Sequence, residues 1–234
     1  ACAEKLRQYK KTEGLVPRSP HLVILLHGMG RSPVLFRDME RALRAAGYDA
    51  VAVSYPSLTK NIAGHADQVE QLLALSQDAE RVSFVTHSLG GLVVREVLSR
   101  EGRPTTRLWR TKLALGRVVM IAPPNQGSEL AKSIAHLPPY HWIGGPAASE
   151  IAAGPPFAPV SPRIEVAVIA GGTTGETGFN PLLSGNNDGV VTVSETRLPG
   201  ASDHIVVRAL HTVIASHPET IAATRNFLET GRLP

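Results

Sequence analysis

Short apolar runs alternate along the chain with segments whose apolar residues repeat at helical spacing. The first run, His21–Leu26 (HLVILL), is continuously apolar, which is typical of a strand in a parallel sheet that is covered on both faces. Similar runs predict strands at Asp49–Ser54, Val82–Val85, Arg117–Ala122, Arg163–Ala170 and Asp203–Val207. Helical spacing predicts helices at Pro33–Ala46, Asn61–Leu75, Leu89–Leu98 and Pro218–Leu228. This alternation predicts a doubly wound α/β architecture, with a mostly parallel sheet of about six strands and helices on both faces.

The apolar pattern covers most of the chain. Its 234 residues suit one compact domain, which we expect over residues 21–234, after a polar N-terminal extension at residues 1–20. One segment, residues 137–162, is rich in proline and glycine, and this composition predicts neither a regular strand nor a long helix. The segment enters between two core strands, at the end of the sheet where ligands bind. It fits a lid or a wall of a binding site, and it fits a plain surface loop equally well.

Composition excludes several classes of function. The chain carries 24 Lys and Arg against 20 Asp and Glu, a net charge of +4, and only 5% aromatic residues, so we expect no nucleic acid partner. The single cysteine, Cys2, excludes an intrachain disulfide framework, and no Cys or His spacing indicates a metal site. Basic residues near the N-terminus favour, weakly, a peripheral contact with a membrane or lipid surface. The role of Cys2, an exposed thiol or the remnant of a lipid-attachment site, stays open.

The segment RVSFVTHSLGGLVVR at Arg81–Arg95 places Ser88 between a predicted strand and a predicted helix. A serine on such a tight turn has its hydroxyl lifted clear of the sheet and the helix N-terminus directed at it, as in a nucleophile elbow. The usual pattern is G-x-S-x-G, and here Thr86 replaces the first glycine. The alternative is an incidental serine at a strand-to-helix turn. The strand and helix on either side of Ser88 favour the nucleophile.

A serine hydroxyl becomes a good nucleophile only when a base removes its proton and a carboxylate orients that base. In this architecture the order along the chain is serine, acid, histidine. The only aspartates that follow Ser88 are Asp188 and Asp203. Asp188 lies in the turn Asn-Asn-Asp-Gly, where small residues let a carboxylate project, so we prefer it to Asp203. Glu165 falls inside a predicted strand, and Glu195 is kept in reserve.

Three histidines follow the predicted acid: His204, His211 and His217. His204 alternates within the last predicted strand, and His217 directly precedes the last helix. His211 lies in the loop after the last strand, where the base of such a site stands, and we predict that it is the base.

The tetrahedral intermediate of acyl transfer also needs hydrogen-bond donors for its oxyanion. The backbone N–H of Leu89 follows the nucleophile and is one candidate. The loop after the first strand, H-G-M-G, offers the N–H of Met29 as the other, with glycines that permit close approach. We expect further residues to shape the site rather than react: His27, Gly28, Gly30, His87, Gly90 and Asn125.

Five segments together resemble the α/β-hydrolases, of the bacterial lipase and esterase type. They are HLVILLHGMG, FVTHSLGGLVVR, APPNQGSELA, NNDGVVTVSET and LHTVIASHPE, in the order found in that family. The resemblance implies an α/β-hydrolase fold and acyl transfer to water through an acyl-serine. Ser88, His211 and Asp188 would be nucleophile, base and orienting acid, without metal or cofactor. Asn125, in P-N-Q-G-S, would have a structural or site-shaping role. No clear pair of extra calcium-binding aspartates is present.

The leading hypothesis is therefore a carboxylesterase or lipase that acts on a small-molecule or lipid ester with an apolar acyl group. A thioesterase, an amidase or an acyltransferase would use the same residues. A catalytically silent binding module is a further alternative, although it would be expected to lose one of the three residues. The sequence leaves open the acyl chain length, the alcohol portion and the oligomeric state. It also leaves open the compartment, bacterial cytoplasm or cell envelope, because a leader before Ala1 could have been removed.

Overall fold

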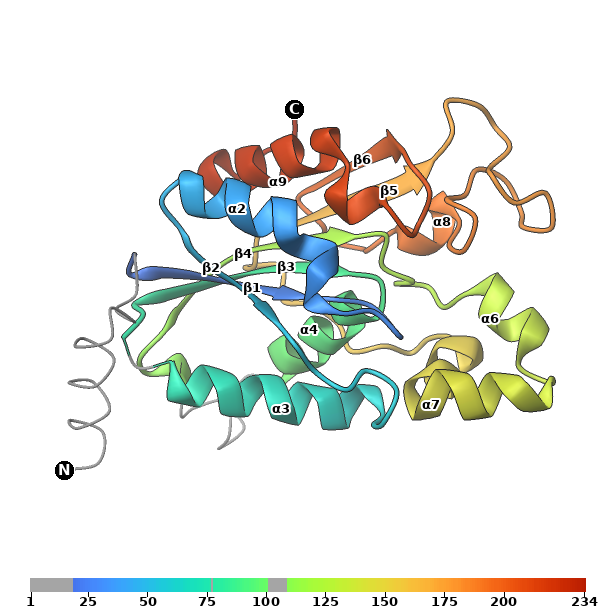
Figure 1. The fold of residues 1–234 in the computed structure, drawn as a ribbon, viewed down its shortest axis with the longest axis horizontal. Helices are drawn as coiled ribbons and strands as arrows, with labels where there is room; N and C mark the ends of the chain where they lie inside the picture. Colours follow the sequence, from blue (N-terminus) through green and yellow to red (C-terminus); the bar gives the residue numbers. More distant parts are fainter. Residues whose placement is uncertain (1–18, 77, 101–108) are drawn as a thin grey trace.

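A single sheet of six parallel strands forms the centre of the protein (Figure 1). The computed structural model describes residues 19–76, 78–100 and 109–234, so most of the predicted N-terminal extension, including Cys2, lies outside the described residues. The strand order is β2-β1-β3-β4-β5-β6. The strands are β1 (His21–Leu26), β2 (Asp49–Val53), β3 (Arg81–His87), β4 (Ala114–Ile121), β5 (Val166–Gly172) and β6 (Asp203–Arg208). The predicted doubly wound, parallel α/β architecture is confirmed.

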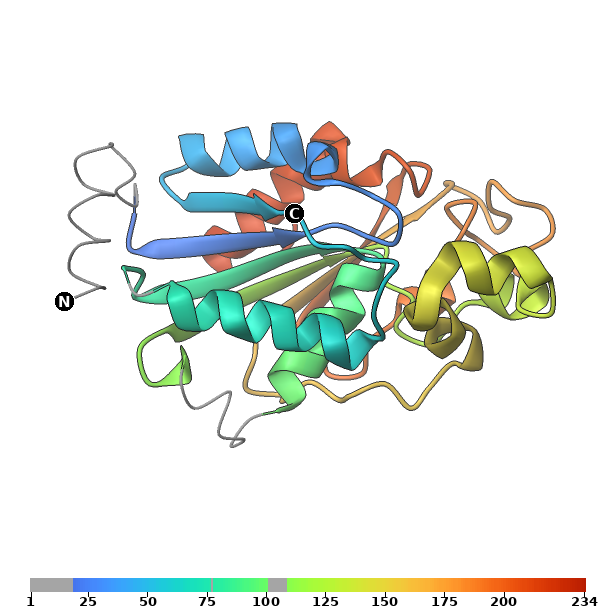
Figure 2. The same cartoon turned by 60° about the horizontal axis from the view of Figure 1, so that its bottom comes forward.

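Helices cover both faces of this sheet. Helices α2 (Arg37–Ala45) and α9 (Pro218–Thr230) lie on one face, and α3 (Ile62–Leu75) and α4 (Leu89–Ser99) lie on the other (Figures 1 and 2). Alternate residues of β1 point to opposite faces: Val23 packs in the core beneath α2 and α9, and Ile24 in the core beneath α3 and α4. Both faces of the strand are buried, which is why its sequence reads as a continuous apolar run.

The predicted starts of two strands were wrong by three residues each. Strand β4 begins at Ala114 rather than Arg117. Strand β5 begins at Val166 rather than Arg163, because the chain is still in a turn there, with the Ile164 N–H donating to the Ser161 carbonyl (3.0 Å). Glu165 therefore precedes β5 and is not inside it.

The segment at residues 137–162 is helical over much of its length, but a kink divides it into two shorter helices rather than one long regular helix. Helix α7 spans Pro138–Ala153 and has a kink at Gly145, whose φ of 67° and ψ of −173° are not helical. The prolines do not prevent this helix. Pro138 stands at its first turn and Pro146 directly follows the kink, and both positions tolerate a missing N–H.

Three short elements near the carboxyl ends of the strands were not predicted. They are the 3₁₀ turn η2 (Ile214–Ser216) and the helices α6 (Glu129–Ile134) and α8 (Val193–Thr196). The helix predicted at Pro33–Ala46 begins as the 3₁₀ turn η1 (Pro33–Phe36) and continues as α2. Helices α6 and α7 lie beyond the end of the sheet to which β1 and β3 point (Figures 1 and 2). In a parallel sheet the loops that follow the strands meet at one edge, so the residues after β1, β3, β4, β5 and β6 converge here.

Candidate active site

Ser88 occupies a strained turn between β3 and α4. Its φ of 53° and ψ of −123° are rare for a residue that has a Cβ atom. The Ser88 N–H donates to the Ile121 carbonyl on β4 (2.9 Å), and the Ser88 carbonyl accepts from the Gly91 N–H (2.9 Å). Ser88 is the N-cap residue of α4, but its hydroxyl makes no capping hydrogen bond. The backbone is therefore held at both sides of the turn, and the hydroxyl is left to the pocket described below.

Two glycines make room for this turn. A Cβ atom on Gly90 would lie 2.4 Å from the Leu26 carbonyl oxygen, and one on Gly28 would lie 2.9 Å from the Ser88 Cβ. Such distances are shorter than any ordinary van der Waals contact, so only glycine fits at either position. The end of β1 and the start of α4 thus approach each other closely around Ser88.

Thr86 takes the place of the usual first glycine without disturbing the turn. Its side chain is fully buried, and its hydroxyl donates to the Val119 carbonyl (3.4 Å). A Cβ atom on Gly91 would lie 3.4 Å from the Thr86 hydroxyl and 3.0 Å from the Pro123 Cβ. Gly91 therefore makes room mainly for Pro123, and the Thr86 hydroxyl would lie at ordinary contact distance.

His211 and Asp188 form a buried hydrogen-bonded pair. The Nδ1 atom of His211 lies 2.7 Å from Oδ2 of Asp188, and the two residues are only 6% and 1% exposed. Because an ionised carboxylate can only accept, Nδ1 carries the proton and Nε2 remains free to act as a base. The other carboxylate oxygen accepts from the Val190 and Val191 N–H groups (3.0 and 2.7 Å), which fixes its orientation.

The backbone around this pair is equally well fixed. The His211 N–H donates to the Asp188 carbonyl (2.9 Å), and a Cβ atom on Gly171 would lie only 2.7 Å from the Asp188 Cβ. The end of β5 therefore has to be glycine for Asp188 to reach its position.

His87 supports His211 from the other side. Its Nε2–H donates to the His211 carbonyl (2.9 Å), and the two rings have their centroids 4.7 Å apart. Complete burial is the main cause that lowers the pKa of His87 well below its usual value, and proximity to His211 and Arg31 adds to it. His87 thus stays neutral and holds the loop that carries His211.

The alternative acids are engaged elsewhere in the structure. The Asp203 carboxylate accepts from the N–H groups of His204 and Leu233 (2.9 and 2.8 Å), and Glu195 caps the N-terminus of α8 through the Thr192 N–H (2.7 Å). Glu165 pairs with Arg117 (2.9 Å), away from Ser88.

The two alternative histidines also make no contact with the Ser88 pocket. His204 bonds to the Thr196 hydroxyl (3.0 Å), and His217 is the N-cap residue of α9. The structure thus brings Asp188 and His211 together and leaves the other candidates outside the pocket.

The loop after β1 is held by several hydrogen bonds. The Tyr55 hydroxyl donates to the His27 carbonyl (2.6 Å), and the two rings stack at 4.5 Å. The His27 Nδ1–H donates to the Gly28 carbonyl (2.9 Å), and the Gly30 N–H donates to the Ser57 hydroxyl (3.0 Å). Among the described residues, nothing accepts a hydrogen bond from the Met29 N–H. The loop is therefore rigid on both sides of Met29 while that N–H stays available.

Leu89 carries the second N–H group that we expected to act as a donor. It is the first residue of α4, and the N–H groups of a first helical turn have no partner inside the helix. The positive end of the helix dipole lies at the same place.

Tyr55 and Ser57, which hold the loop that carries Met29, were missed by the sequence analysis. The only sequence feature that could have pointed to these two residues is their position directly after β2, the strand that pairs with β1.

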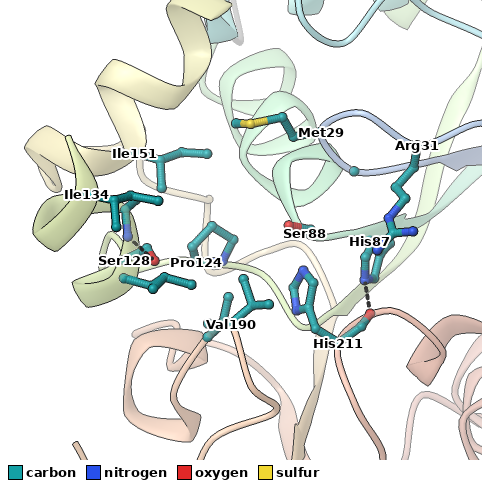
Figure 3. Close-up of a pocket in the computed structure, with 14 residues that line it drawn as sticks. Met29, Arg31, His87, Ser88, Pro124, Ser128, Ile134, Ile151, Val190 and His211 are labelled. Carbon is teal, nitrogen blue, oxygen red and sulfur yellow. Dashed lines mark hydrogen bonds between the residues drawn. The ribbon is translucent and has the colours of Figure 1, made fainter. Parts of the chain in front are cut away.

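Ser88 and His211 line one pocket of about 260 Å³ (Figure 3). Its walls are largely apolar and come from α6, α7 and the loops after β4 and β5: Pro124, Leu130, Ala131, Ile134, Ile151, Val190 and Val191. The segment at residues 137–162 thus contributes a wall through Ile151. Among the described residues, no hydrogen bond joins the Ser88 hydroxyl to the His211 ring.

Asn125 lies behind the pocket rather than in its lining. Its side chain donates to the Thr196 carbonyl (2.8 Å) and accepts from the Arg95 guanidinium (3.0 Å). It thereby ties the loop after β4 to α4 and α8.

The described residues contain no cluster of three or more His, Cys, Asp or Glu side chains that could hold a metal ion. None of the helices in that part of the chain is long and apolar enough to cross a membrane.

Comparison with solved structures shows the α/β-hydrolase fold. The lipase BlEst2 of Bacillus licheniformis, in its mature form, is 20% identical, with a TM-score of 0.69 over 93% of this chain and 94% of that one. A structure from a study of carboxylesterases of Nitrososphaera gargenis is 14% identical, with a TM-score of 0.59 over 92% of both chains. The RedJ thioesterase of Streptomyces coelicolor is 14% identical, with a TM-score of 0.56 over 91% of this chain and 85% of that one.

Sequence comparisons identify the family to which the chain belongs. No curated protein matches it significantly. One family model matches residues 3–137, which include the loop after β1 and Ser88 but neither Asp188 nor His211. Since this match covers more than half of the chain, the protein belongs to the family described as "Domain of unknown function (DUF7379)".

Proposed function

We propose that this protein is a serine hydrolase that cleaves carboxylic esters of apolar acyl groups through an acyl-serine intermediate. One observation carries the proposal: a serine on a strained strand-to-helix turn lines the same pocket as a histidine bonded to a buried aspartate. Ser88 is the nucleophile, His211 the general base and Asp188 the residue that orients it. The lipase and carboxylesterase among the structural neighbours support this choice.

The proposed reaction uses each of these groups in turn. As the ester binds, Nε2 of His211 takes the proton of the Ser88 hydroxyl, and the oxygen attacks the carbonyl carbon. The N–H groups of Met29 and Leu89 stabilise the negative oxygen of the tetrahedral intermediate. The intermediate collapses, the alcohol leaves with the proton from His211, and water then releases the acid by the same steps in the second half of the reaction.

The acyl group lies against the apolar wall in this proposal. Side chains of α6 and α7 form that wall, including Leu130, Ile134 and Ile151. An apolar wall of this kind binds an acyl chain by removing its surface from water, without a defined hydrogen-bond pattern.

A thioesterase is the second candidate, because the RedJ thioesterase has the same fold and the same residues would serve. Hydrolysis of an acyl ester and of a thioester with the same acyl group separates the two. A larger kcat/KM for the thioester would assign the protein to the second class.

The primary test uses p-nitrophenyl esters from acetate to palmitate, with the Ser88→Ala variant beside the wild type. We expect the variant to lose at least about a thousandfold in kcat, because no other group replaces the nucleophile. Ser99→Ala, on the same helix, is the matched control and should keep full activity. If the wild type cleaves none of the esters and Ser88 does not react with a fluorophosphonate, the proposal is wrong.

A further inference from the structure

Arg31 lines the same pocket as Ser88 and His211 and is not used by the proposed mechanism. It lies in the loop between β1 and η1, and its backbone N–H donates to the Gly28 carbonyl (3.2 Å). Among the described residues that line this pocket, Arg31 is the only one with a permanent charge. A guanidinium stays protonated at every physiological pH, so the pocket always carries this positive charge.

Nothing in the described part of the pocket neutralises that charge. No Asp or Glu is among the lining residues, and Arg31 makes no ion pair with any described residue. The nearby carboxylate of Asp188 is buried and already bonded to His211, Val190 and Val191. The field of Arg31 nevertheless extends into the site, where it adds to the effect of burial in lowering the pKa of His87.

The pocket therefore has two unlike sides. In Figure 3, Ile134 and Ile151 lie on one side of Ser88 and His211, and Arg31 lies on the other, next to His87. An ester bound with its carbonyl at Ser88 has to place one portion against the apolar wall and the other towards Arg31. The acyl chain fits the wall, which leaves the alcohol portion facing the guanidinium.

We propose that the natural substrate is an ester with an apolar acyl group and an alcohol portion that carries an anion, a carboxylate or a phosphate, which Arg31 binds. This inference rests on the proposed function. A guanidinium presents paired N–H donors that match both anions, and a charge-assisted hydrogen bond is stronger than a neutral one. Arg31 is exposed, so water weakens the interaction.

The test compares matched neutral and anionic esters. One pair is p-nitrophenyl butyrate and its analogue with a carboxylate on the ring beside the nitro group. The other pair is octanoylglycerol and octanoylglycerol phosphate, so that the carboxylate and phosphate sources are tested separately. The measured quantity is the ratio of kcat/KM for the anionic ester to that for the neutral ester, in wild type and Arg31→Gln. Differences in chemical reactivity within a pair cancel when the variant is compared with the wild type.

We expect the ratio to fall about tenfold in Arg31→Gln for at least one pair, mainly through KM. The effect is no larger because a hydrogen bond between two charged groups contributes little binding free energy when it is exposed to water. Arg31→Lys should restore part of the ratio, and added salt should lower it in the wild type. Arg37→Gln is the matched control, because Arg37 is exposed at the start of α2 but does not line the pocket. The ratio should not change in this variant.

An unchanged ratio in Arg31→Gln for both pairs, with full activity on the neutral esters, would overturn the inference and leave the proposed hydrolase function intact. A third substrate, the p-nitrophenyl monoester of succinate, places the anion on the acyl side. If Arg31→Gln affects only this substrate, the assigned orientation is wrong. Absence of activity on every ester, with no labelling of Ser88, would instead remove the function on which the inference rests.

Discussion

At the amino-terminal ends of the strands, the structure holds a pocket of about 440 Å³, larger than the pocket of about 260 Å³ around Ser88 at the carboxyl ends. Charged and polar groups line the larger one and bond to each other. Arg117 pairs with Glu165 (2.9 Å) and donates to the Leu228 carbonyl (2.8 Å), and His21 bonds to the Ser83 hydroxyl (2.9 Å).

The smaller pocket has the opposite character. It combines an apolar wall, a strained serine and a histidine whose second nitrogen is free. The comparison teaches that pocket size by itself does not identify the candidate site. Side chains whose charges and hydrogen bonds are paired with one another stabilise the fold. Side chains with an unpaired donor, acceptor or charge are available to bind a substrate.

The strongest test of this comparison replaces one carboxylate with an amide at each end of the sheet. Asp188→Asn should lower kcat about ten-thousandfold, because an amide in its place no longer holds the His211 tautomer with Nε2 free. Glu165→Gln, at the other end, should leave kcat within the error of the assay. Equal kcat values for the two variants would mean that the Asp188–His211 pair, like the Glu165–Arg117 pair, only stabilises the fold.

A second test removes one hydroxyl from a tyrosine near each end. Tyr55→Phe loses the 2.6 Å hydrogen bond to the His27 carbonyl, and the loop that carries Met29 loosens. We expect kcat to fall about tenfold with little change in KM, since loss of a whole oxyanion donor costs more. Tyr48→Phe, in the larger pocket, is the control and should not change kcat. A change in KM alone would show that Tyr55 contributes to substrate binding and not to the donor loop.

The smallest expected effect concerns stability at acid pH. Burial, with the charges of Arg81 and Arg117, lowers the pKa of His21 to about 4 from its usual value of 6.5. Between these values the unfolded chain binds a proton that the folded protein does not, so the stabilisation present above about pH 6.5 is lost as the pH falls towards about 4. His27, His87 and His204 act in the same direction, because burial lowers the pKa of each.

Urea denaturation at several pH values measures this loss. The wild type should lose more unfolding free energy between about pH 7 and about pH 4.5 than His21→Gln does. Hydrolysis by the variant at neutral pH should be unchanged, because His21 belongs to the larger pocket. Parallel pH curves for the two proteins would exclude His21 as a source of the effect.

Local pattern predicted the elements of the core well and the irregular segments poorly. The strand at His21–Leu26 follows from its continuous apolar run, and the helix at Pro218–Leu228 from the helical spacing of its apolar residues. Both patterns are properties of the sequence alone. Helix α7 was missed because it has proline at its start and a kink at Gly145 followed by Pro146. Composition counts prolines and glycines, but it does not give their positions relative to a helix start.

For the site, the sequence by itself determined that Ser88 stands on a strand-to-helix turn, and it narrowed the acid and the base through their order along the chain. Only the tertiary structure decided that Asp188 and His211 meet at 2.7 Å, while Asp203 and Glu195 cap backbone N–H groups elsewhere.

Tertiary structure likewise decided that Tyr55 holds the loop before Met29 and that Arg31 faces the pocket from the side opposite the apolar wall. The physical reason is the same in each case. Periodicity records which side of an element is buried, whereas contacts between loops depend on the order of the strands in the sheet. Neighbours in the sheet, such as β1 and β2 or β5 and β6, bring together residues that no local pattern connects.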